Sequence, residues 1–137
     1  MSSIIEFFVA PDPDAAADVI DGGPSDEYET ASYGNFDVLS TIEEWEQILT
    51  GGYTGGAEVV AGGDDEPLVL LIPPAVTAAL AAASGGELAD VTDQWLDLRA
   101  EAGEEIDEEL AAELLAEVAA LATEAVRAGA SLYCWVS

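Results

Sequence analysis

The stretch SLYCWV, residues 131–136, decides the fold of this chain. It predicts a β-strand, because aromatic, β-branched and other apolar residues follow Ser131 without a break. Successive side chains of a strand face opposite ways, so Leu132, Cys134 and Val136 would lie on one face and the two aromatic residues on the other. Both faces would then be apolar, which favours a strand covered on both sides.

A strand of this kind at the edge of a sheet would invite aggregation, so we expect residues 131–136 to lie inside the sheet. The partners predicted for it are residues 4–9 (IIEFFV) and residues 67–72 (PLVLLI), which have the same strand-forming character. The first and last strands are expected to be neighbours. Residues 57–60 are an open alternative as a fourth strand.

Cap residues and apolar residues at helical spacing predict about five helices. They lie at 13–21, 40–50, 74–84, 87–103 and 107–129. The second would begin with a capping box, formed by Thr41 with Glu44 or by Ser40 with Glu43. The three tryptophans fall on predicted stripes or strands and are expected in the core. The prediction is a single α+β domain over residues 1–137, with a central sheet of three or four strands covered by these helices.

The charge of the chain is extreme: 29 acidic residues stand against two basic ones, Arg99 and Arg127, for a formal net charge of −27. Nucleic acid and anionic membranes are bound through Lys and Arg, so the sequence argues against both kinds of partner. Half of the residues are hydrophobic. Disorder requires low hydrophobicity as well as high charge, so a folded domain is expected.

Three interpretations of the acidity remain open. The first is adaptation of the surface to a salty environment or to a GC-rich coding background, with acids keeping the protein soluble. The second is an acidic face that meets a basic protein partner. The third is mimicry of the DNA backbone by carboxylates arranged along a ridge.

The residues that most enzymes need are missing. The chain has no His and no Lys, so the usual general bases and nucleophile activators are absent. Clustered carboxylates at 11–14 and 62–66 do not match the spacing of an EF-hand loop. We therefore expect no catalytic residues, no metal ligands and no cofactor. A carboxylate-based enzyme that depends on a divalent cation is kept as the alternative.

The favoured function is a non-catalytic protein-interaction module of the inhibitor, immunity or adaptor type that binds a basic partner. Acidic residues of the last helix and two aromatic residues of the turn-rich segment 24–36 are the candidates for contacting it. These residues are Glu108, Glu109, Glu113, Glu117, Tyr28 and Tyr33. Segment 24–36 itself predicts a loop, with a short strand as an open alternative. The oligomeric state is left open.

The remaining sequence signals concern location and redox state. The N-terminal residues MSSIIEFFV lack the basic region of a secretory signal, and the densest apolar run is too short to span a bilayer, so the cytoplasm is expected. Cys134 is the one cysteine, which excludes a disulfide within the chain. Its aromatic neighbours predict a buried, unreactive thiol.

Two segments carry a resemblance to known proteins. The beginning, FFVAPDPDAAADVID at residues 7–21, and the end, an alanine-rich helix leading into LYCWV, resemble small uncharacterised acidic proteins of actinobacteria. More distantly, the layout is similar to the YfbM-like domain family, whose members end in a helix followed by an apolar strand. The resemblance implies an α+β domain of unknown biochemical role, and it transfers no functional residues.

Overall fold

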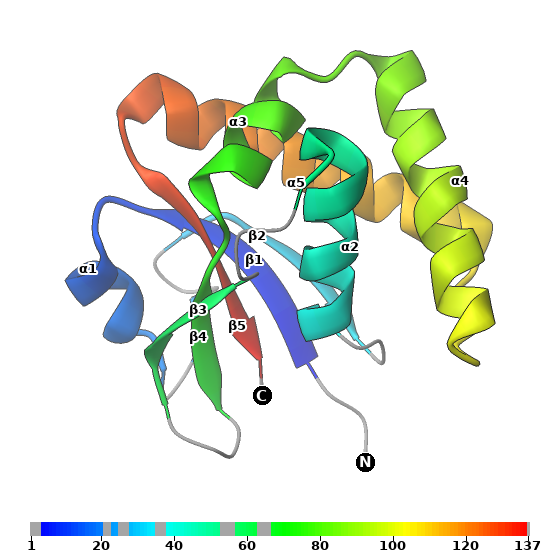
Figure 1. Cartoon of the computed structure of the whole chain (residues 1–137). Coiled ribbons are helices and arrows are strands. Elements are labelled where there is room, and N and C mark those ends of the chain that lie inside the picture. The colour runs from blue at the N-terminus through cyan, green and yellow to red at the C-terminus, as the bar shows by residue number, and fades with distance from the viewer. Residues whose placement is uncertain are drawn as a thin grey trace.

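The computed structural model describes residues 4–20, 23–24, 28–34, 38–52, 57–62 and 67–136. Within these residues the chain forms five helices and five strands, arranged as one α+β domain (Figure 1). The α+β class is therefore confirmed.

The sheet has five strands in the order β2-β1-β5-β4-β3, and every neighbouring pair is antiparallel. Its strands are β1 (Ile4–Ala10), β2 (Thr30–Gly34), β3 (Glu58–Ala61), β4 (Leu68–Leu71) and β5 (Ser131–Val136). The prediction of three or four strands was wrong, because it counted segment 24–36 as a loop and kept a short strand there only as an alternative. Strand β2 forms there by pairing with β1, a long-range contact that the polar, turn-rich sequence does not reveal.

Strand β5 is the middle strand of the sheet, as its sequence predicts. Cys134 lies opposite Phe7 of β1 on one side and opposite Leu70 of β4 on the other. All residues from Leu132 to Val136 are buried. The predicted pairing of the first and last strands is thus confirmed, and β5 pairs with both of its candidate partners.

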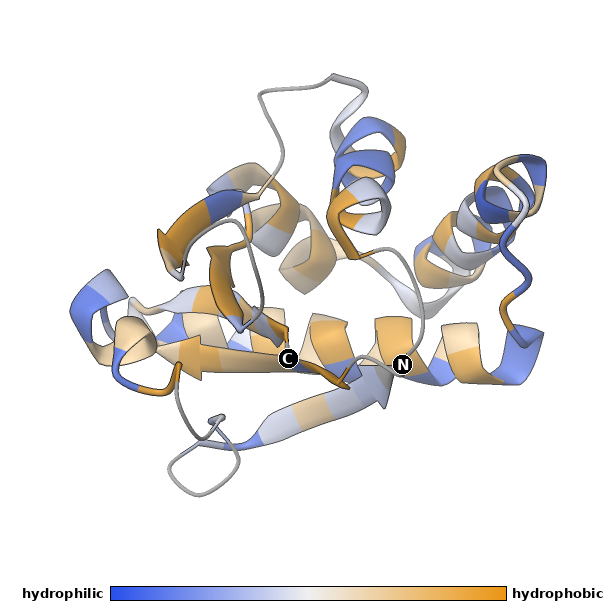
Figure 2. Ribbon diagram, turned by 90° about the horizontal axis from the view of Figure 1, so that it is seen from below, coloured by the Kyte–Doolittle hydropathy of each residue, from blue (hydrophilic) through white to orange (hydrophobic). Residues whose placement is uncertain are grey.

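Helices cover both faces of the sheet unequally (Figure 1). The helices are α1 (Pro13–Ala17), α2 (Val38–Thr50), α3 (Pro74–Ala82), α4 (Gly85–Glu101) and α5 (Glu108–Ala128). Helices α2 to α5 form a layer over one face, and the short α1 packs on the other. In Figure 2 the central strands are largely hydrophobic, whereas hydrophobic and hydrophilic residues alternate along the helices.

The alternation of side chains in β5 divides the core into two parts, as predicted. Leu132, Cys134 and Val136 belong to the core beneath the helical layer, and Tyr133 and Trp135 belong to the core beneath α1. Burial of these apolar side chains stabilises the fold by about 1.5–3 kcal/mol for each fully buried large residue.

The tryptophans lie in the core, which confirms the prediction. Trp45 stacks on Phe7 with ring centroids 5.8 Å apart and meets Trp95 edge-on at 5.4 Å. Trp135, beneath α1, donates its indole N–H to the carbonyl of Ile20 at 3.0 Å. The contacts of Trp45 with Phe7 and with Trp95 link helices α2 and α4 to the sheet.

Some predicted helix boundaries were wrong. Helix α2 begins at Val38, so neither Thr41 nor Ser40 caps it. Thr41 is buried instead, and its hydroxyl accepts a hydrogen bond from the indole N–H of Trp95 at 3.2 Å. Helix α1 ends at Ala17, four residues before its predicted end at residue 21. Helix α4 begins at Gly85 because Ser84 caps it through a capping box that the sequence analysis did not assign.

None of the helices in the described part of the chain has the length and apolar character that a membrane crossing requires.

Candidate protein-interaction surface

Helix α5 carries all four acidic residues predicted to contact a partner. The side chain of Asp107 caps its start by accepting a hydrogen bond from the Leu110 N–H at 3.1 Å. Glu108 and Glu109 occupy the first turn, where negative charge interacts favourably with the helix dipole. Gly129 ends the helix in the left-handed conformation, with φ of +68°. Glu108 and Glu109 therefore have a local role in helix stability, whether or not they bind a partner.

The two sides of α5 differ sharply. Its inner side is buried against the sheet and the neighbouring helices, and includes Leu114, Val118 and Ala125. Leu110, four residues before the buried Leu114, is itself 39% exposed, because the buried side of the first turn is centred on Ala111. The outer side carries exposed glutamates, of which Glu109, Glu113 and Glu117 follow one another at steps of four residues.

One hydrogen bond joins this helix to strand β2. The phenol Oη of Tyr33 donates to Oε2 of Glu117 at 2.6 Å. The pKa of the Tyr33 phenol is raised well above its ordinary value of about 10 by partial burial, by this hydrogen bond and by the charges of Glu117 and Glu113. Three of the predicted contact residues, far apart in the sequence, therefore lie together.

Next to this contact, the surface between α5 and β2 is hollowed. A hollow of about 320 Å³ is lined by Glu29, Thr30, Ala31, Glu117, Ala120, Leu121 and Glu124. A second, of about 340 Å³, shares three of these residues and extends along the end of α5 to Val9, Ala10, Pro11, Ala128 and Ala130. We call the two together the α5–β2 groove. Each lies at the lower end of the usual size range of ligand pockets, about 300–1,000 Å³.

The groove is strongly negative. Glu29, Glu117 and Glu124 line it, and Glu113 stands one helical turn before Glu117. Arg127 reaches Glu124 at 3.6 Å between Nη1 and Oε2, but both side chains are more than half exposed. A pair so exposed is screened by water and neutralises little of the charge. The groove can therefore attract cationic groups.

Tyr28 does not join this surface. Its ring lies 5.6 Å from the ring of Phe8, on the face of the sheet that α1 covers. Tyr28 is half-buried and contributes to packing there. Glu108 is exposed but lies about 100° around the helix from the row formed by Glu109, Glu113 and Glu117. The structure thus brings together Tyr33, Glu113 and Glu117, with Glu109 on the same row.

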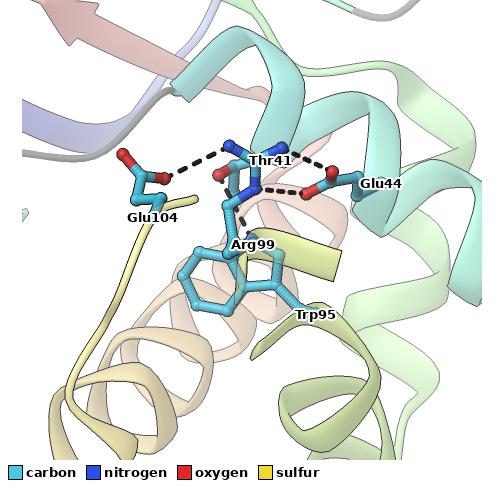
Figure 3. Close-up of polar contacts among 5 residues, drawn as sticks. All are labelled: Thr41, Glu44, Trp95, Arg99 and Glu104. Atoms are coloured by element: carbon cyan, nitrogen blue, oxygen red, sulfur yellow. Dashed lines mark hydrogen bonds and ion pairs between the residues drawn. The ribbon is translucent and has the colours of Figure 1, made fainter. Parts of the chain in front are cut away.

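A second polar cluster was missed by the sequence analysis (Figure 3). Arg99 of α4 donates from Nε and Nη2 to the two carboxylate oxygens of Glu44 at 2.8 and 2.6 Å, and from Nη1 to Glu104 at 3.2 Å. The hydrogen bond with Glu44 raises the pKa of Arg99 more than burial lowers it. This cluster joins α2, α4 and the start of the loop that leads to α5.

A sequence signal for the Arg99 cluster exists. Arg99 follows Trp95 by four residues and so continues the apolar stripe of its helix into the core. Its side chain is 7% exposed, and those of Glu44 and Glu104 are 17% and 25% exposed. A buried cation on an apolar stripe requires acidic partners, so its position alone points to an ion pair. The arrangement holds helices together and presents little surface to a ligand.

Cys134 is completely buried, as predicted. Burial, and to a lesser degree the charge of Glu6, raises the pKa of its thiol well above the ordinary value. A thiol that is buried and protonated at neutral pH cannot act as a nucleophile in the folded state.

Metal ligands are not assembled in the described residues, which contain no group of three or more acidic or cysteine side chains placed to hold an ion. In the cluster at 11–14, Asp12 instead caps α1 by accepting a hydrogen bond from the Ala15 N–H at 2.8 Å. Residues 63–66 of the other predicted cluster, and the aromatic residues Phe36 and Tyr53, lie outside the described residues.

Comparison with known proteins yields one solved structure and no family. No family model matches the chain. No curated protein matches it either. The chain is similar to the crystal structure of YfbM, a protein of unknown function from Escherichia coli, with 13% identity and a TM-score of 0.44 over 98% of this chain and 99% of that one. YfbM is a weakly similar structural neighbour, and a match at this level carries no argument about function. The resemblance to acidic actinobacterial proteins stays a prediction.

Proposed function

We propose that this chain is a non-catalytic protein-interaction module, of the inhibitor, immunity or adaptor type, that binds a basic protein through the α5–β2 groove. The observation that carries the proposal is the contact of Tyr33 with Glu117 beside a hollow lined by three glutamates. This contact places acidic residues of α5 next to those at the start of β2, so that they form one continuous surface. We expect the protein to act in the cytoplasm and without a cofactor.

The row of glutamates on α5 supports this proposal energetically. Glu109, Glu113 and Glu117 are spaced four apart, so each faces a like charge on the next turn. Such pairs destabilise a helix by roughly 0.2–0.5 kcal/mol each. Cationic side chains of a partner would relieve this repulsion on binding, and the long-range field would speed association.

The test is a binding measurement with a matched pair of variants. The α5 variant carries Glu113→Gln, Glu117→Gln and Glu124→Gln, which remove three charges from the surface while keeping the side-chain shape. Proteins retained from host lysate by the immobilised wild type and by the variant are identified and compared, and their affinities are measured across a salt series.

The α4 control carries Asp90→Asn, Asp93→Asn and Asp97→Asn, three exposed positions on a different helix. It has the same net charge as the α5 variant. The proposal predicts a basic partner that binds wild type and α4 control alike, binds the α5 variant at least about tenfold more weakly, and is released by salt. Equal loss in both variants would mean that only total charge matters, and the proposed surface would be wrong.

A further inference from the structure

Strand β2 leaves one edge of the sheet unpaired. It stands at the end of the strand order, and its inner edge pairs with β1 from Ile4 opposite Gly34 to Phe8 opposite Thr30. No described segment pairs with its outer edge. An edge strand presents N–H and C=O groups of alternate residues outward, ready to pair with another extended chain.

Helix α5 runs beside this edge in the opposite direction. Glu117 contacts Tyr33 late in β2, whereas Glu124 lines the same hollow as Glu29 and Thr30 at its start. A strand added to the outer edge would lie about 4.8 Å beyond β2. Its side chains on the helical face would then stand next to the outer side of α5, where the glutamates project.

The spacing of charges along α5 matches that of an extended chain. Residues four apart on a helix are separated by about 6 Å along its axis, and residues two apart on a strand by about 6.7 Å. Glu117 stands beside Tyr33 and Glu124 lines the hollow beside Thr30, so cationic residues of a strand paired with β2 would meet these two glutamates. Glu113 and Glu109 stand one and two helical turns beyond the Tyr33 end of β2, where they would attract the part of the bound segment that continues past Gly34. Between Glu117 and Glu124, Ala120 and Leu121 form an apolar stretch, which suits the aliphatic stems of Lys or Arg.

We infer that the α5–β2 groove binds an extended segment of a basic protein, with Lys or Arg at alternate positions, which adds to the outer edge of β2 as a sixth strand. This inference rests on the proposed function and specifies how the partner binds. The charge of the chain argues against a second copy of this chain as the occupant. A second copy, with a formal net charge of −27, would be repelled from the acidic groove, whereas a basic segment would be attracted. The acidic lining provides affinity for the side chains, and the edge provides main-chain hydrogen bonds.

The probe is a fluorescein-labelled peptide of alternating lysine and threonine, measured by anisotropy against the full chain. A second peptide has the same composition but all its lysines in one block. A third is the alternating peptide with N-methylated central amides, which keeps its charge but cannot donate main-chain hydrogen bonds. Hydrogen exchange of the Thr30–Gly34 amides is followed with and without each peptide.

The inference predicts that the alternating peptide binds most tightly and slows exchange within β2. N-methylation should weaken it by at least about tenfold, the equivalent of losing one or two net hydrogen bonds. The α5 variant should lose this binding and the α4 control should keep it.

Other outcomes separate the two proposals. If all three peptides bind equally, lose affinity in the α5 variant and leave exchange in β2 unchanged, strand addition is overturned while the acidic recognition surface stands. If no peptide binds more tightly to the wild type than to the α5 variant, both proposals fail.

Discussion

The guanidinium of Arg99 and the carboxylate of Glu44 form a two-point contact, with hydrogen bonds of 2.8 and 2.6 Å, between helices α4 and α2. Arg99 is one of only two basic residues in the chain, and its side chain is buried in the interior. The exterior is therefore almost purely anionic.

Replacing Arg99 by Met should destabilise the protein, because Glu44 and Glu104 would keep their partly buried charges without a cation. We expect a loss of about 2–4 kcal/mol in the free energy of unfolding, measured by urea denaturation with tryptophan fluorescence. Arg127→Met is the matched control. Its side chain is 74% exposed, and its loss should cost less than about 0.5 kcal/mol. Equal effects of the two substitutions would show that the Arg99 cluster does not hold the helices together.

Gly62 is required by the β3–β4 connection. Its φ is +100°, and a Cβ there would lie 2.5 Å from the carbonyl oxygen of Pro67. Gly103 has a similar φ of +89° but open space around it. We expect Gly103→Ala to cost about 1 kcal/mol of backbone strain, and Gly62→Ala to cost roughly 1–3 kcal/mol more because of the clash. Denaturation midpoints that fall equally would contradict this geometry.

The raised pKa of Tyr33 makes a prediction about alkaline stability. The phenol ionises near pH 10 in the unfolded chain and at higher pH in the folded one, so its contribution is complete below pH 10 and is lost as the pH rises above it. Tyr33→Phe removes this ionising group, so the free energy of unfolding should fall less steeply above pH 10 than in the wild type. The difference between the two slopes should be less than about 1 kcal/mol per pH unit, because the phenol is partly exposed to water.

The measurement for Tyr33 is a set of urea midpoints between pH 8 and pH 11 for the wild type and Tyr33→Phe. Glu117→Gln should give an intermediate slope, because it removes a charge beside the phenol but keeps a hydrogen-bond acceptor. Identical slopes in all three proteins would refute the contact between β2 and α5.

Salt should stabilise the fold, because 29 acidic residues repel one another in the compact state. The screening length falls from about 30 Å at 0.01 M salt to about 8 Å at 0.15 M, so most of the rise in melting temperature should occur over this range of NaCl. A melting temperature that stays flat or falls between low and molar salt would show that repulsion does not limit stability. A rise confined to molar concentrations would point instead to solute exclusion.

The sequence predicted the parts of the fold that depend on hydrophobic pattern. β5 was placed correctly because both of its faces are apolar, and α5 because its cap, stripe and terminal glycine agree. β2 was predicted only as an alternative to a loop, because its strand character comes from pairing with β1 rather than from its own composition. The cap of α2 was predicted wrongly because Thr is a common N-cap residue. In the structure the Thr41 hydroxyl instead accepts a hydrogen bond from the indole N–H of Trp95 in the core.

The candidate surface could be predicted only in part. The exposed glutamates of α5 follow from helical spacing, but their position beside Tyr33 depends on tertiary packing. Tyr28 and Tyr33 have the same type and similar surroundings in the sequence, and only the fold sends them to opposite sides of the sheet. The hollow between α5 and β2 involves segments about 90 residues apart, which no local pattern connects.

The position of α5 beside β2 depends on β5 being the buried middle strand, because α5 leads directly into β5 and β5 pairs with β1, the neighbour of β2. Native-state hydrogen exchange measures this most directly. We predict that the backbone amides of Leu132–Val136 are among the slowest in the chain and exchange only through global unfolding, so that their opening free energy equals the free energy of unfolding from urea denaturation. Rapid exchange of these amides under conditions where α5 remains protected would contradict the fold and the surface built on it.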